Sequence, residues 1–507
     1  MGMLKTIVGT RVPEKYQKFF NLPPRRESSK IADTDDTQLG RAANEWLRGR
    51  GDKCGILRLD LGLDALAIRV GLIDAAEKSI DIQSYLIKDD LSGNLISLKL
   101  IEAAQRGVRV RVLMDDALTE DIDAGLLSLN YFSNIEIRVF NPFPRRRSRV
   151  ISFIANFNIL NRRMHNKSFT VDNQVTIVGG RNIADEYYQT RHDSEFLDED
   201  LLAIGPVVDD VSDGFDEYWN TRESVPIDVF ESLVERRPPD EALRAGREFL
   251  EQHKDSPYLR AADDRLIRQF LAGQLPLLEA VAEVVLDHPD KARGLTRDQI
   301  GETSEYLRKL ISSATEEVII VSPYFVPQKR GVRFLGGLAD NGVRVVVITN
   351  SLASTNHASV HAVYARYRKP LLRRGVEIYE LRPRASGASL EEDSSLIAKL
   401  TLHSKVAVVD RRDVFVGSFN LDPRSLYINT EMGMSVRCEQ LATSMRHSVL
   451  RSLNRHAYSL RLAPNGGLRW KYMTRNGEKM AAKEPHTDLW LRIKTRLMGL
   501  LPIESQM

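Results

Sequence analysis

The sequence predicts an α/β protein built from two similar halves, because one pattern of Val- and Ile-rich runs and helical stretches occurs twice. IDIQSY at 80–85 is matched by VIIVSPY at 318–324, and each follows a stretch of helical periodicity. IEAAQRGVRVRVLMDD at 101–116 is matched by LGGLADNGVRVVVITN at 335–350. Helices that alternate with buried strands build layered sheets, and a repeat of this length indicates two copies of one fold.

Composition excludes several classes of protein. Lys and Arg number 72 and Asp and Glu 69, a net charge of +3, so binding of phosphate groups has to come from local clusters of charge. The hydrophobic content of 42% is ordinary for a folded soluble protein. Cys54 and Cys438 are too few for a disulfide framework and fit a reducing compartment. The sequence has no run of about 18 apolar residues, so a membrane-spanning helix is not expected.

Composition also divides the rest of the chain. The region between the halves is rich in charge, Pro and helix formers, and the polar, Pro-containing run at 22–40 is typical of a mobile extension. The predicted organisation is a partly disordered N-terminal extension at 1–54, a first half at 55–221, a helical connector at 222–295, a second half at 296–465 and a C-terminal segment at 466–507.

The C-terminal segment is expected to contain an amphipathic helix, with cationic residues at its polar edge. The apolar positions that share one helical face are Leu489, Trp490, Ile493, Leu497, Leu500 and Leu501. Two interpretations remain open. The helix either packs on its own domain through this face, or it presents the face to a membrane surface.

Residues 142–167 interleave Arg with Phe and Ile directly before the first motif histidine. Cationic side chains there suit anionic lipid head groups, while the aromatic rings enter the membrane interface. A solvated basic loop over the site has the same composition, and so does a groove for nucleic acid. The sequence leaves these three interpretations open.

One segment carries the chemistry, and it occurs once in each half. HNKSFTVDNQVTIVGGRN at 165–182 and HSKVAVVDRRDVFVGSFN at 403–420 both fit H-x-K-x(4)-D-x(6)-G-x-x-N. Their offset, 403 − 165 = 238 residues, agrees with the repeat, so the match is not a coincidence. Each motif begins as a β-strand, in which alternate side chains share a face. We therefore expect His165 to lie beside Lys167, and His403 beside Lys405.

The remaining motif positions have different expected roles. Asp172 and Asp410 complete the catalytic motif, but their odd offset from the histidines points them to the opposite face. We expect a structural role for both, in binding neighbouring backbone or a basic residue. Asn182 and Asn420 follow the next strand and can donate to a phosphate oxygen, and so can Ser418. Two His, two Lys and two Asn together would make a cationic, donor-rich site for one phosphate.

A histidine nucleophile needs its second ring nitrogen held by a carboxylate. Asp200 and Glu431 supply one candidate in each half, and Asp198 is a rival of Asp200. No cofactor or metal is expected, because lysine and asparagine side chains can neutralise charge on the phosphate and no ligand spacing suits a catalytic metal. His357 and His361 lie one helical turn apart but lack a third ligand, so a polar pocket wall is preferred to a zinc site.

The paired H-x-K-x(4)-D segments resemble those of the phospholipase D superfamily. Longer stretches are similar to the bacterial cardiolipin synthases of the C type, namely RRMHNKSFTVDNQVTIVGGRNIADEYY, AIGPVVDDV, ITNSLAST, VHAVYARYRKPLLRRGVEIYELRP and GSFNLDPRS. The resemblance runs from about residue 55 to the C-terminus. It implies two α/β/α sandwich halves with mixed sheets and one active site at their interface. Gly180 stands where the superfamily commonly has Ser, whereas Ser418 is present in the second motif.

The resemblance also implies a reaction. His165 would attack the phosphorus of a donor phospholipid to form a phosphatidyl-histidine, and His403 would protonate the leaving alcohol, although pseudo-symmetry alone allows the reverse. The implied donor is phosphatidylethanolamine, the acceptor is phosphatidylglycerol, and the product is cardiolipin. The implied location is peripheral, on the cytoplasmic face of the bacterial inner membrane. The alternatives are a phosphodiesterase or nuclease that uses water, with nucleic acid the less expected partner, and a non-catalytic lipid-binding scaffold.

Overall fold

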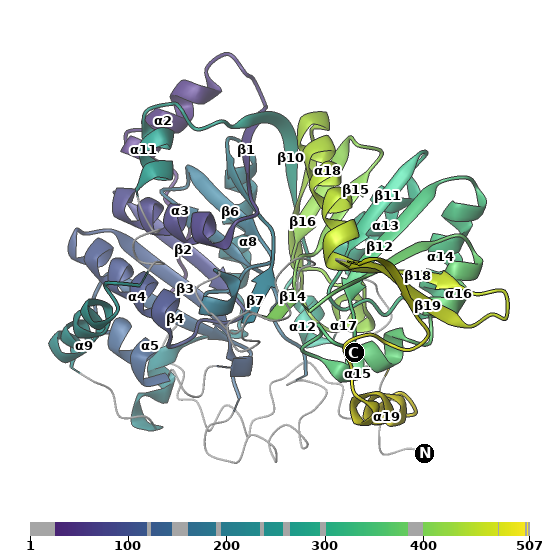
Figure 1. Ribbon diagram of the computed structural model, residues 1–507. Helices are drawn as coiled ribbons and strands as arrows, with labels where there is room; N and C mark the ends of the chain where they lie inside the picture. Colours follow the sequence, from purple (N-terminus) through teal and green to yellow (C-terminus); the bar gives the residue numbers. More distant parts are fainter. Residues whose placement is uncertain are drawn as a thin grey trace, which may run out of the picture.

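The structure of the 507-residue chain is a computed structural model. It describes residues 26–118, 123–143, 161–188, 194–233, 238–256, 264–294, 301–383, 399–474, 476–501 and 504. Two halves stand side by side in Figure 1, the first in purple to teal and the second in green to yellow. Residues 1–25 of the N-terminal extension and residues 144–160 of the Arg-rich segment lie outside the described residues.

The first half is a mixed sheet in the order β9-β4-β3-β2-β5-β6-β8-β1, in which β2, β3 and β4 are parallel. Its strands are β1 (Cys54–Leu59), β2 (Ser79–Ser84), β3 (Arg109–Asp115), β4 (Ile135–Phe140), β5 (Ser168–Val171), β6 (Val175–Gly179), β8 (Asp200–Ile204) and β9 (Ser224–Pro226). Its helices are α2 (Gln38–Leu47), α3 (Gly62–Ala75), α4 (Leu91–Gln105), α5 (Asp123–Leu129), α8 (Val207–Trp219), α9 (Pro239–Gln252) and α11 (Arg265–Leu271), with short 3-10 helices at Asp116–Leu118, Asp185–Tyr187 and Ile227–Leu233.

The second half repeats this order as β18-β13-β12-β11-β15-β16-β17-β10, with β19 and β20 added beyond β18. Its strands are β10 (Leu278–Leu286), β11 (Glu317–Val321), β12 (Arg344–Asn350), β13 (Glu377–Leu381), β15 (Val406–Val409), β16 (Asp413–Gly417), β17 (Met432–Arg437), β18 (Ala457–Leu462), β19 (Leu468–Thr474) and β20 (Gly477–Ala481). Its helices are α12 (Asp290–Arg293), α13 (Glu302–Ser312), α14 (Gln328–Asp340), α15 (Ala358–Tyr364), α16 (Arg368–Arg373), α17 (Pro423–Tyr427), α18 (Glu439–His456) and α19 (Leu489–Met498).

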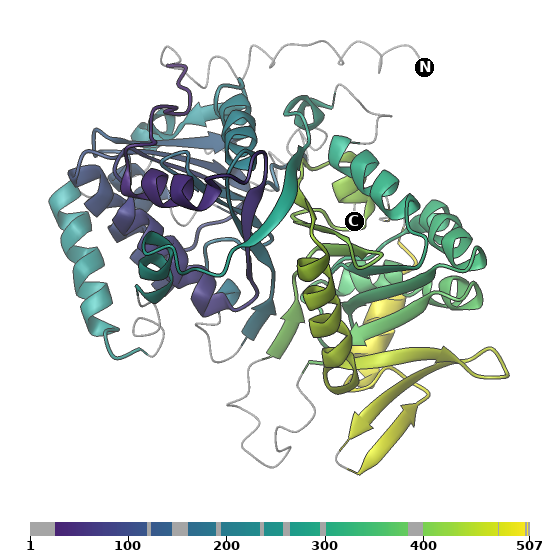
Figure 2. The ribbon, with the colours of Figure 1, turned by 90° about the horizontal axis from the view of Figure 1, so that it is seen from above.

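The two sheets are continuous through β10. Residues 278–280 of this strand pair with β1 and residues 281–286 pair with β17, so one strand belongs to both halves. Figure 2 shows it passing between them. A second link is formed by β7 (Ser194–Leu197) and β14 (Lys399–Leu402), which pair in parallel across the interface. The predicted fold class, two similar α/β halves with mixed sheets, is confirmed.

Alternate residues of each sheet enter different cores. On one face of the first sheet, Ile177 and Leu202 pack with the apolar residues of α3 and α4. On the other face, Val178 and Leu201 join a core that also contains Met434 and the buried residues of α18. Because this second core takes side chains from both sheets, the two halves share one hydrophobic interface.

Two predictions about the additions are wrong. The connector predicted to be helical contains β9 and β10 besides α9, α11 and α12, because pairing with strands on both sides overrides the helix propensity of Leu, Glu and Ala in LEAVAEVVL. The described part of the run at 22–40 is not free of the fold. Lys30 pairs with Asp209 and Asp213 of α8 at 2.7 Å, and Arg111 donates to the carbonyl of Ser28.

The motif aspartates fasten the hairpins β5–β6 and β15–β16 to the sheet. Asp172 accepts from the backbone N–H groups of residues 77–79 and Asp410 from those of residues 315–317, at 2.7 to 3.3 Å. Each aspartate has φ of 49° and the next residue is also left-handed, as a type I′ turn requires. The geometry is that of the expected structural role.

We predict that Asp172→Ala lowers the free energy of unfolding by about 2 to 3 kcal/mol, because one buried and two partly buried N–H groups lose a charged acceptor. Urea unfolding followed by circular dichroism measures it. The control is Asp213→Ala, which removes a side chain that is 65% exposed and, within the described residues, forms an ion pair with Lys30 alone. This change should cost below about 1 kcal/mol. Equal losses in the two variants would contradict the role of Asp172.

Candidate active site

The two motif segments meet where the halves join, and each is held by backbone from the other half. The N–H of His165 donates to the carbonyl of Thr430 at 2.9 Å. The N–H of His403 donates to the carbonyl of Leu197 at 2.8 Å, as the continuation of the β7–β14 pair. Both histidines are buried, with exposed fractions of 9% and 5%. The site therefore exists only when both halves are folded together.

Each imidazole is also held by a carboxylate from the opposite half. Nδ1 of His165 lies 2.8 Å from Oε2 of Glu431, and Nδ1 of His403 lies 2.6 Å from Oδ2 of Asp198. An ionised carboxylate can only accept, so the ring proton of each neutral histidine is on Nδ1 and the lone pair is on Nε2. The carboxylates directly follow Thr430 and Leu197 in the chain, so one short segment fixes both backbone and ring.

Asp200 does not hold a histidine, which corrects the prediction for that residue. Its carboxylate pairs with Arg69 at 2.8 Å and with Arg181 at 3.3 Å. The strand register explains why. Gly179 pairs with Asp200 in the first half and Gly417 pairs with Gly433 in the second, so the equivalent of Glu431, two residues earlier, is Asp198. The rival candidate occupies the histidine-orienting position.

Ser418 supports Glu431, in place of the predicted contact with phosphate. Its hydroxyl donates to Oε2 of Glu431, and the hydroxyl of Ser425 donates to Oε1 at 2.7 Å. In the first half, a Cβ added at Gly180 would lie 2.1 Å from Oδ1 of Asp198. Because Gly180 has no side chain, the carboxylate of Asp198 can occupy the space that the Ser418 hydroxyl occupies in the second half.

Two buried lysines supply positive charge. Nζ of Lys167 donates to the carbonyl of His165 at 2.7 Å, and Nζ of Lys405 donates to the carbonyl of His403 and lies 3.2 Å from its Nε2. Burial lowers the pKa of Lys167 to about 7 and that of Lys405 to about 8, although Glu431 and Asp198 favour the charged forms. Both lysines therefore lose their positive charge as the pH rises above neutral.

The same burial keeps the histidines neutral. It lowers the pKa of His165 to about 4, against the attraction of Glu431. Burial and the charge of Lys405 lower the pKa of His403 to about 3, against the attraction of Asp198. A neutral imidazole with a free Nε2 lone pair is a nucleophile. An arriving phosphate anion opposes both shifts and favours the protonated ring that a general acid needs.

The asparagines of the motif lie in the same buried region. Asn182 donates to the hydroxyl of Tyr187 at 2.8 Å, and Asn420 is tied through its backbone N–H to Ser425. Within the described residues, Oδ1 of each amide is buried without a hydrogen-bond partner. A 180° amide rotation lets Tyr187 donate to Asn182 and frees the NH₂ group for a phosphate oxygen, as predicted for an oxyanion donor.

Three aromatic side chains that the sequence did not single out pack against the motif histidines. Tyr85 packs edge-on against His165 at 5.2 Å between centroids, Tyr187 packs edge-on against His403 at 5.0 Å, and Phe196 stacks on His403 at 5.3 Å. Burial raises the pKa of Tyr85 to about 12 and that of Tyr324 further. Tyr85 and Tyr324 end the matched strands 80–85 and 318–324, so the repeat carried a signal for them.

Two further residues position the motif backbone. Asp115 ends β3 and accepts from the N–H of Met164, the residue before His165, at 2.8 Å. Asn350 ends β12 and accepts from the N–H of Leu402, the residue before His403, at 2.9 Å. The carboxyl end of a parallel strand thus places a hydrogen-bond acceptor at the equivalent position in each half. The matched ends of the segments 101–116 and 335–350 could have identified this pair.

The described residues contain no group of three or more His, Cys, Asp or Glu side chains that could hold a metal ion. His361 faces Glu484 at 3.4 Å, and His357 packs edge-on against Tyr324 at 5.2 Å between centroids. The two histidines therefore contact different partners, a carboxylate for His361 and an aromatic ring for His357.

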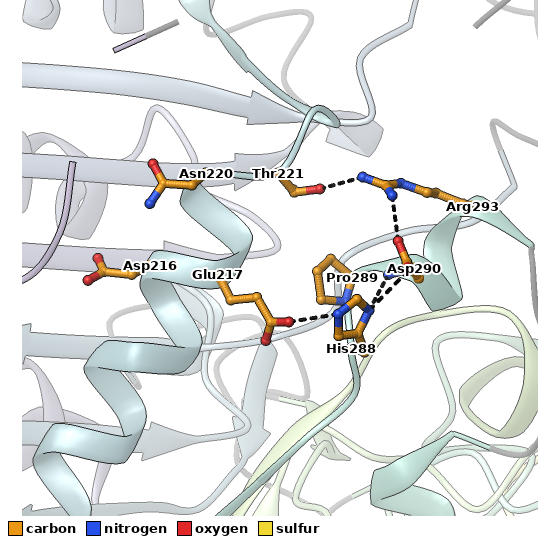
Figure 3. A pocket seen from close by; sticks show the side chains of 8 residues that line it. All are labelled: Asp216, Glu217, Asn220, Thr221, His288, Pro289, Asp290 and Arg293. Atoms are coloured by element: carbon orange, nitrogen blue, oxygen red, sulfur yellow. Dashed lines mark hydrogen bonds and ion pairs between the residues drawn. The ribbon is translucent and has the colours of Figure 1, made fainter. Parts of the chain in front are cut away.

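A hollow of about 460 Å³ beside α8 and α12 contains none of the motif residues. Figure 3 shows Glu217, His288, Asp290 and Arg293 pointing toward one another, whereas Asp216 points away from them. Glu217 pairs with His288 at 2.8 Å, and Arg293 pairs with Asp290 and donates to Thr221 at 2.9 Å. Because these groups satisfy one another, the hollow is a structural junction between the halves, and the chemistry belongs to the buried motif pair.

The arrangement suits a reaction in which a phosphorus-linked group is transferred from one oxygen to another. One neutral imidazole can attack phosphorus, the second can protonate the leaving oxygen, and the two ammonium groups can bind the non-bridging oxygens. The carboxylates fix the rings and stabilise the imidazolium forms. The cross-half pairing gives the two histidines separate carboxylates, so they can take different protonation states during one reaction.

Comparison with known proteins gives a consistent result. The family described as "Cardiolipin synthase, PLD-like domain" matches residues 70–219 and 307–451. Cardiolipin synthase C of Escherichia coli (strain K12) is 40% identical over 455 residues, 89% of this chain and 96% of the relative. Cardiolipin synthase B of Shigella flexneri is 26% identical and matches 74% of this chain and 75% of the relative. The fold resembles the crystal structure of phosphatidylserine synthase of Haemophilus influenzae Rd KW20, with a TM-score of 0.55, 14% identity and coverage of 84% and 92%.

The corrected carboxylate assignment makes a testable distinction. Asp198→Asn should lower turnover per folded protein by at least about 100-fold, because it removes the anion that orients His403. Asp200→Asn, the matched change two residues away, should lower thermal stability by weakening the pairs with Arg69 and Arg181, and leave turnover within a few-fold. Turnover per folded protein and calorimetry of both variants test this, and the opposite pattern would restore Asp200 to the site.

Proposed function

The chain belongs to the phospholipase D superfamily and, within it, to the bacterial cardiolipin synthases, and on this premise we propose that it makes cardiolipin through a covalent phosphatidyl-histidine. It is a phosphatidyltransferase. The observation that carries the detailed proposal is the exchange of carboxylates, which gives each buried histidine a partner from the other half. That arrangement equips one site with a nucleophile and an acid–base group.

In the first step, Nε2 of His165 attacks the phosphorus of the donor phospholipid. His403 takes up a proton on Nε2 from solvent as the phosphodiester anion binds. A nitrogen–phosphorus bond then forms while the bond from phosphorus to the head-group oxygen breaks, and His403 transfers that proton to the oxygen. In the second step, His403 removes the proton of a hydroxyl of phosphatidylglycerol. The oxygen then attacks phosphorus, the nitrogen–phosphorus bond breaks, and both imidazoles return to their starting forms when His403 releases its proton to solvent.

A difference between the two motifs supports His165 as the nucleophile. Nζ of Lys405 lies 3.1 Å from Nδ1 and 3.2 Å from Nε2 of His403, so an ammonium group lies close to this ring. In the described part of the chain, Lys167 donates to the carbonyl of His165 and makes no hydrogen bond to its ring. Proximity to a cation also lowers the pKa of His403, which makes it the stronger acid when protonated.

The donor is proposed to be phosphatidylethanolamine, the lipid that the resemblance to C-type synthases implies. The proposed location is the cytoplasmic face of a bacterial inner membrane, with peripheral attachment. None of the helices in the described ranges has the length and apolar content to cross a bilayer.

We predict that purified protein converts labelled phosphatidylglycerol to cardiolipin only when phosphatidylethanolamine is also supplied, with release of ethanolamine. Lipid mass spectrometry measures both products. His165→Ala should lower formation by about 1,000-fold or more, since no covalent intermediate can form. With phosphatidylethanolamine labelled in its phosphatidyl group, quenching in denaturant at neutral to mildly alkaline pH should trap the label on the parent protein, because a nitrogen–phosphorus bond hydrolyses in acid. The label should also be trapped on His403→Ala when the donor has a leaving group that needs little protonation.

Other product patterns would change the assignment. Cardiolipin from phosphatidylglycerol alone would replace the donor, and phosphatidic acid alone would make water the acceptor. A label on His403 in place of His165 would reverse the two roles. Absence of any lipid product from folded protein would contradict the proposal and direct attention to nucleic acid substrates.

The pH dependence follows from the two lysines. A lysine is cationic below its pKa, and burial lowers the pKa of Lys167 to about 7 and that of Lys405 to about 8. We predict that kcat/KM falls as pH rises through 7 to 8, because the free enzyme loses charges that bind the phosphate. In Lys167→Arg, whose charge persists at high pH, the residual kcat/KM should fall only at higher pH, when Lys405 loses its proton. An unchanged pH profile in this variant would contradict the assignment.

A further inference from the structure

Helix α19 exposes its apolar face to solvent. Trp490 is 74% exposed, Leu497 61% and Leu500, in the turn after the helix, 80%. The other exposed apolar residues of this face are Leu489, Ile493 and Leu501. At about 100° per residue these positions fall within an arc of about 120°. We call this set of six residues the α19 apolar face.

The opposite side of the helix packs on the second half. Thr495 and Gly499 are buried there, and α19 contacts α15. The segment after the helix is held in place, because Glu504 pairs with Arg366 at 3.3 Å and accepts from the hydroxyl of Tyr367. A helix that covers its own domain buries its large apolar side chains. The packed side of this helix buries a threonine and a glycine and half-buries Leu491 and Met498, while four leucines, an isoleucine and a tryptophan are exposed. The docked interpretation therefore does not account for the α19 apolar face.

The charges around this face all have one sign. Residues 489–503 contain Arg492, Lys494 and Arg496 and no acidic residue. On the helical wheel, Lys494 and Arg496 border the α19 apolar face on its two sides. Neither has an ion-pair partner in the part of the chain that the structure describes. A bare apolar strip between two cations complements a lipid surface with anionic head groups.

The helix also lies at the edge of the molecule that contains the catalytic residues. Helix α15, on which it packs, follows the carboxyl end of β12. Asn350 at that end bonds Leu402, the residue before His403. Figure 1 shows α15, α17 and α19 together at this edge, while α2 and α11 lie at the opposite edge. A bilayer that receives α19 would therefore face the end of the sheets where the motif segments meet.

We propose that the α19 apolar face inserts into the interface of an anionic phospholipid bilayer and attaches the protein there. The inference deepens the proposed function, since it names the contact through which lipid substrates are reached. Trp490 and the leucines enter the acyl boundary, and Lys494 and Arg496 bind phosphate groups at its rim.

Co-sedimentation with large vesicles tests the attachment directly. Partitioning of the parent protein should be strong with vesicles of phosphatidylglycerol and phosphatidylcholine and at least about tenfold weaker with phosphatidylcholine alone. Leu497→Glu should lower partitioning by at least about tenfold, and Lys494→Glu with Arg496→Glu should remove most of the preference for the anionic lipid. The matched control is Leu271→Glu on α11, an exposed leucine at the opposite edge, which should partition as the parent does.

A second measurement is made first on the parent protein, so its outcome does not depend on whether the variants fold. Tryptophan emission of the parent should shift to shorter wavelength on addition of anionic vesicles and be quenched by brominated acyl chains, and Trp490→Phe should lose most of both effects. Absence of any shift or quenching would overturn the proposal. So would equal partitioning of Leu497→Glu and the parent, or a dimer in sedimentation analysis that Leu497→Glu alone converts to monomer while vesicle binding is unchanged.

Short-chain substrates separate this inference from the proposed reaction. Leu497→Glu should turn over dihexanoyl phospholipids below their micelle concentration as fast as the parent, and turn over vesicle lipids more slowly. Vesicle binding through α19 by a protein without transferase activity would support the attachment and contradict the proposed function. Full activity on vesicles in Leu497→Glu would overturn the attachment and leave the proposed function intact.

Discussion

The rest of the structure depends on one constraint, namely that each half supplies a short segment that holds the motif histidine of the other half. Each motif histidine donates its backbone N–H to a carbonyl of the other half, and the next residue there supplies the carboxylate that holds its ring. Neither half can complete a site alone. The continuous strand β10 and the hydrophobic core shared by both sheets hold the two segments in fixed relative positions. The interactions that stabilise the interface between the halves therefore also determine the catalytic geometry.

Burial of charge decides the chemistry of this site. Lys167 and Lys405 face Asp198 and Glu431, so two cations and two anions balance while both histidines are neutral. In a site removed from water, the negative charge of a bound phosphodiester raises the pKa of a nearby imidazole, which allows one of the two histidines to be protonated. The aromatic rings of Tyr85, Tyr187 and Phe196 pack against the imidazoles and exclude water around them.

The halves are similar in backbone and different in side chains, and the differences lie at the carboxylates. Glu431 is supported by Ser418 and Ser425, whereas Asp198 occupies the space beside Gly180. Asp115 positions the first motif with a charged group, and burial raises the pKa of Asp115 to about 6, while Asn350 positions the second with a neutral amide. A duplicated fold has thereby become asymmetric where two histidines need different roles, and the asymmetry requires no change in the strands that carry them.

The sequence alone determined the duplicated α/β fold, the motif residues His165, Lys167, His403 and Lys405, and the structural place of Asp172 and Asp410, because periodicity and spacing are local properties. Tertiary structure decided which carboxylate holds which histidine. Asp198 and Asp200 lie two residues apart near one strand, and only the pairing of β6 with β8 and the contact between halves distinguish them. It also made a strand of β10, whose composition favours a helix, and turned the apolar face of α19 outward, since both depend on which neighbour a segment finds.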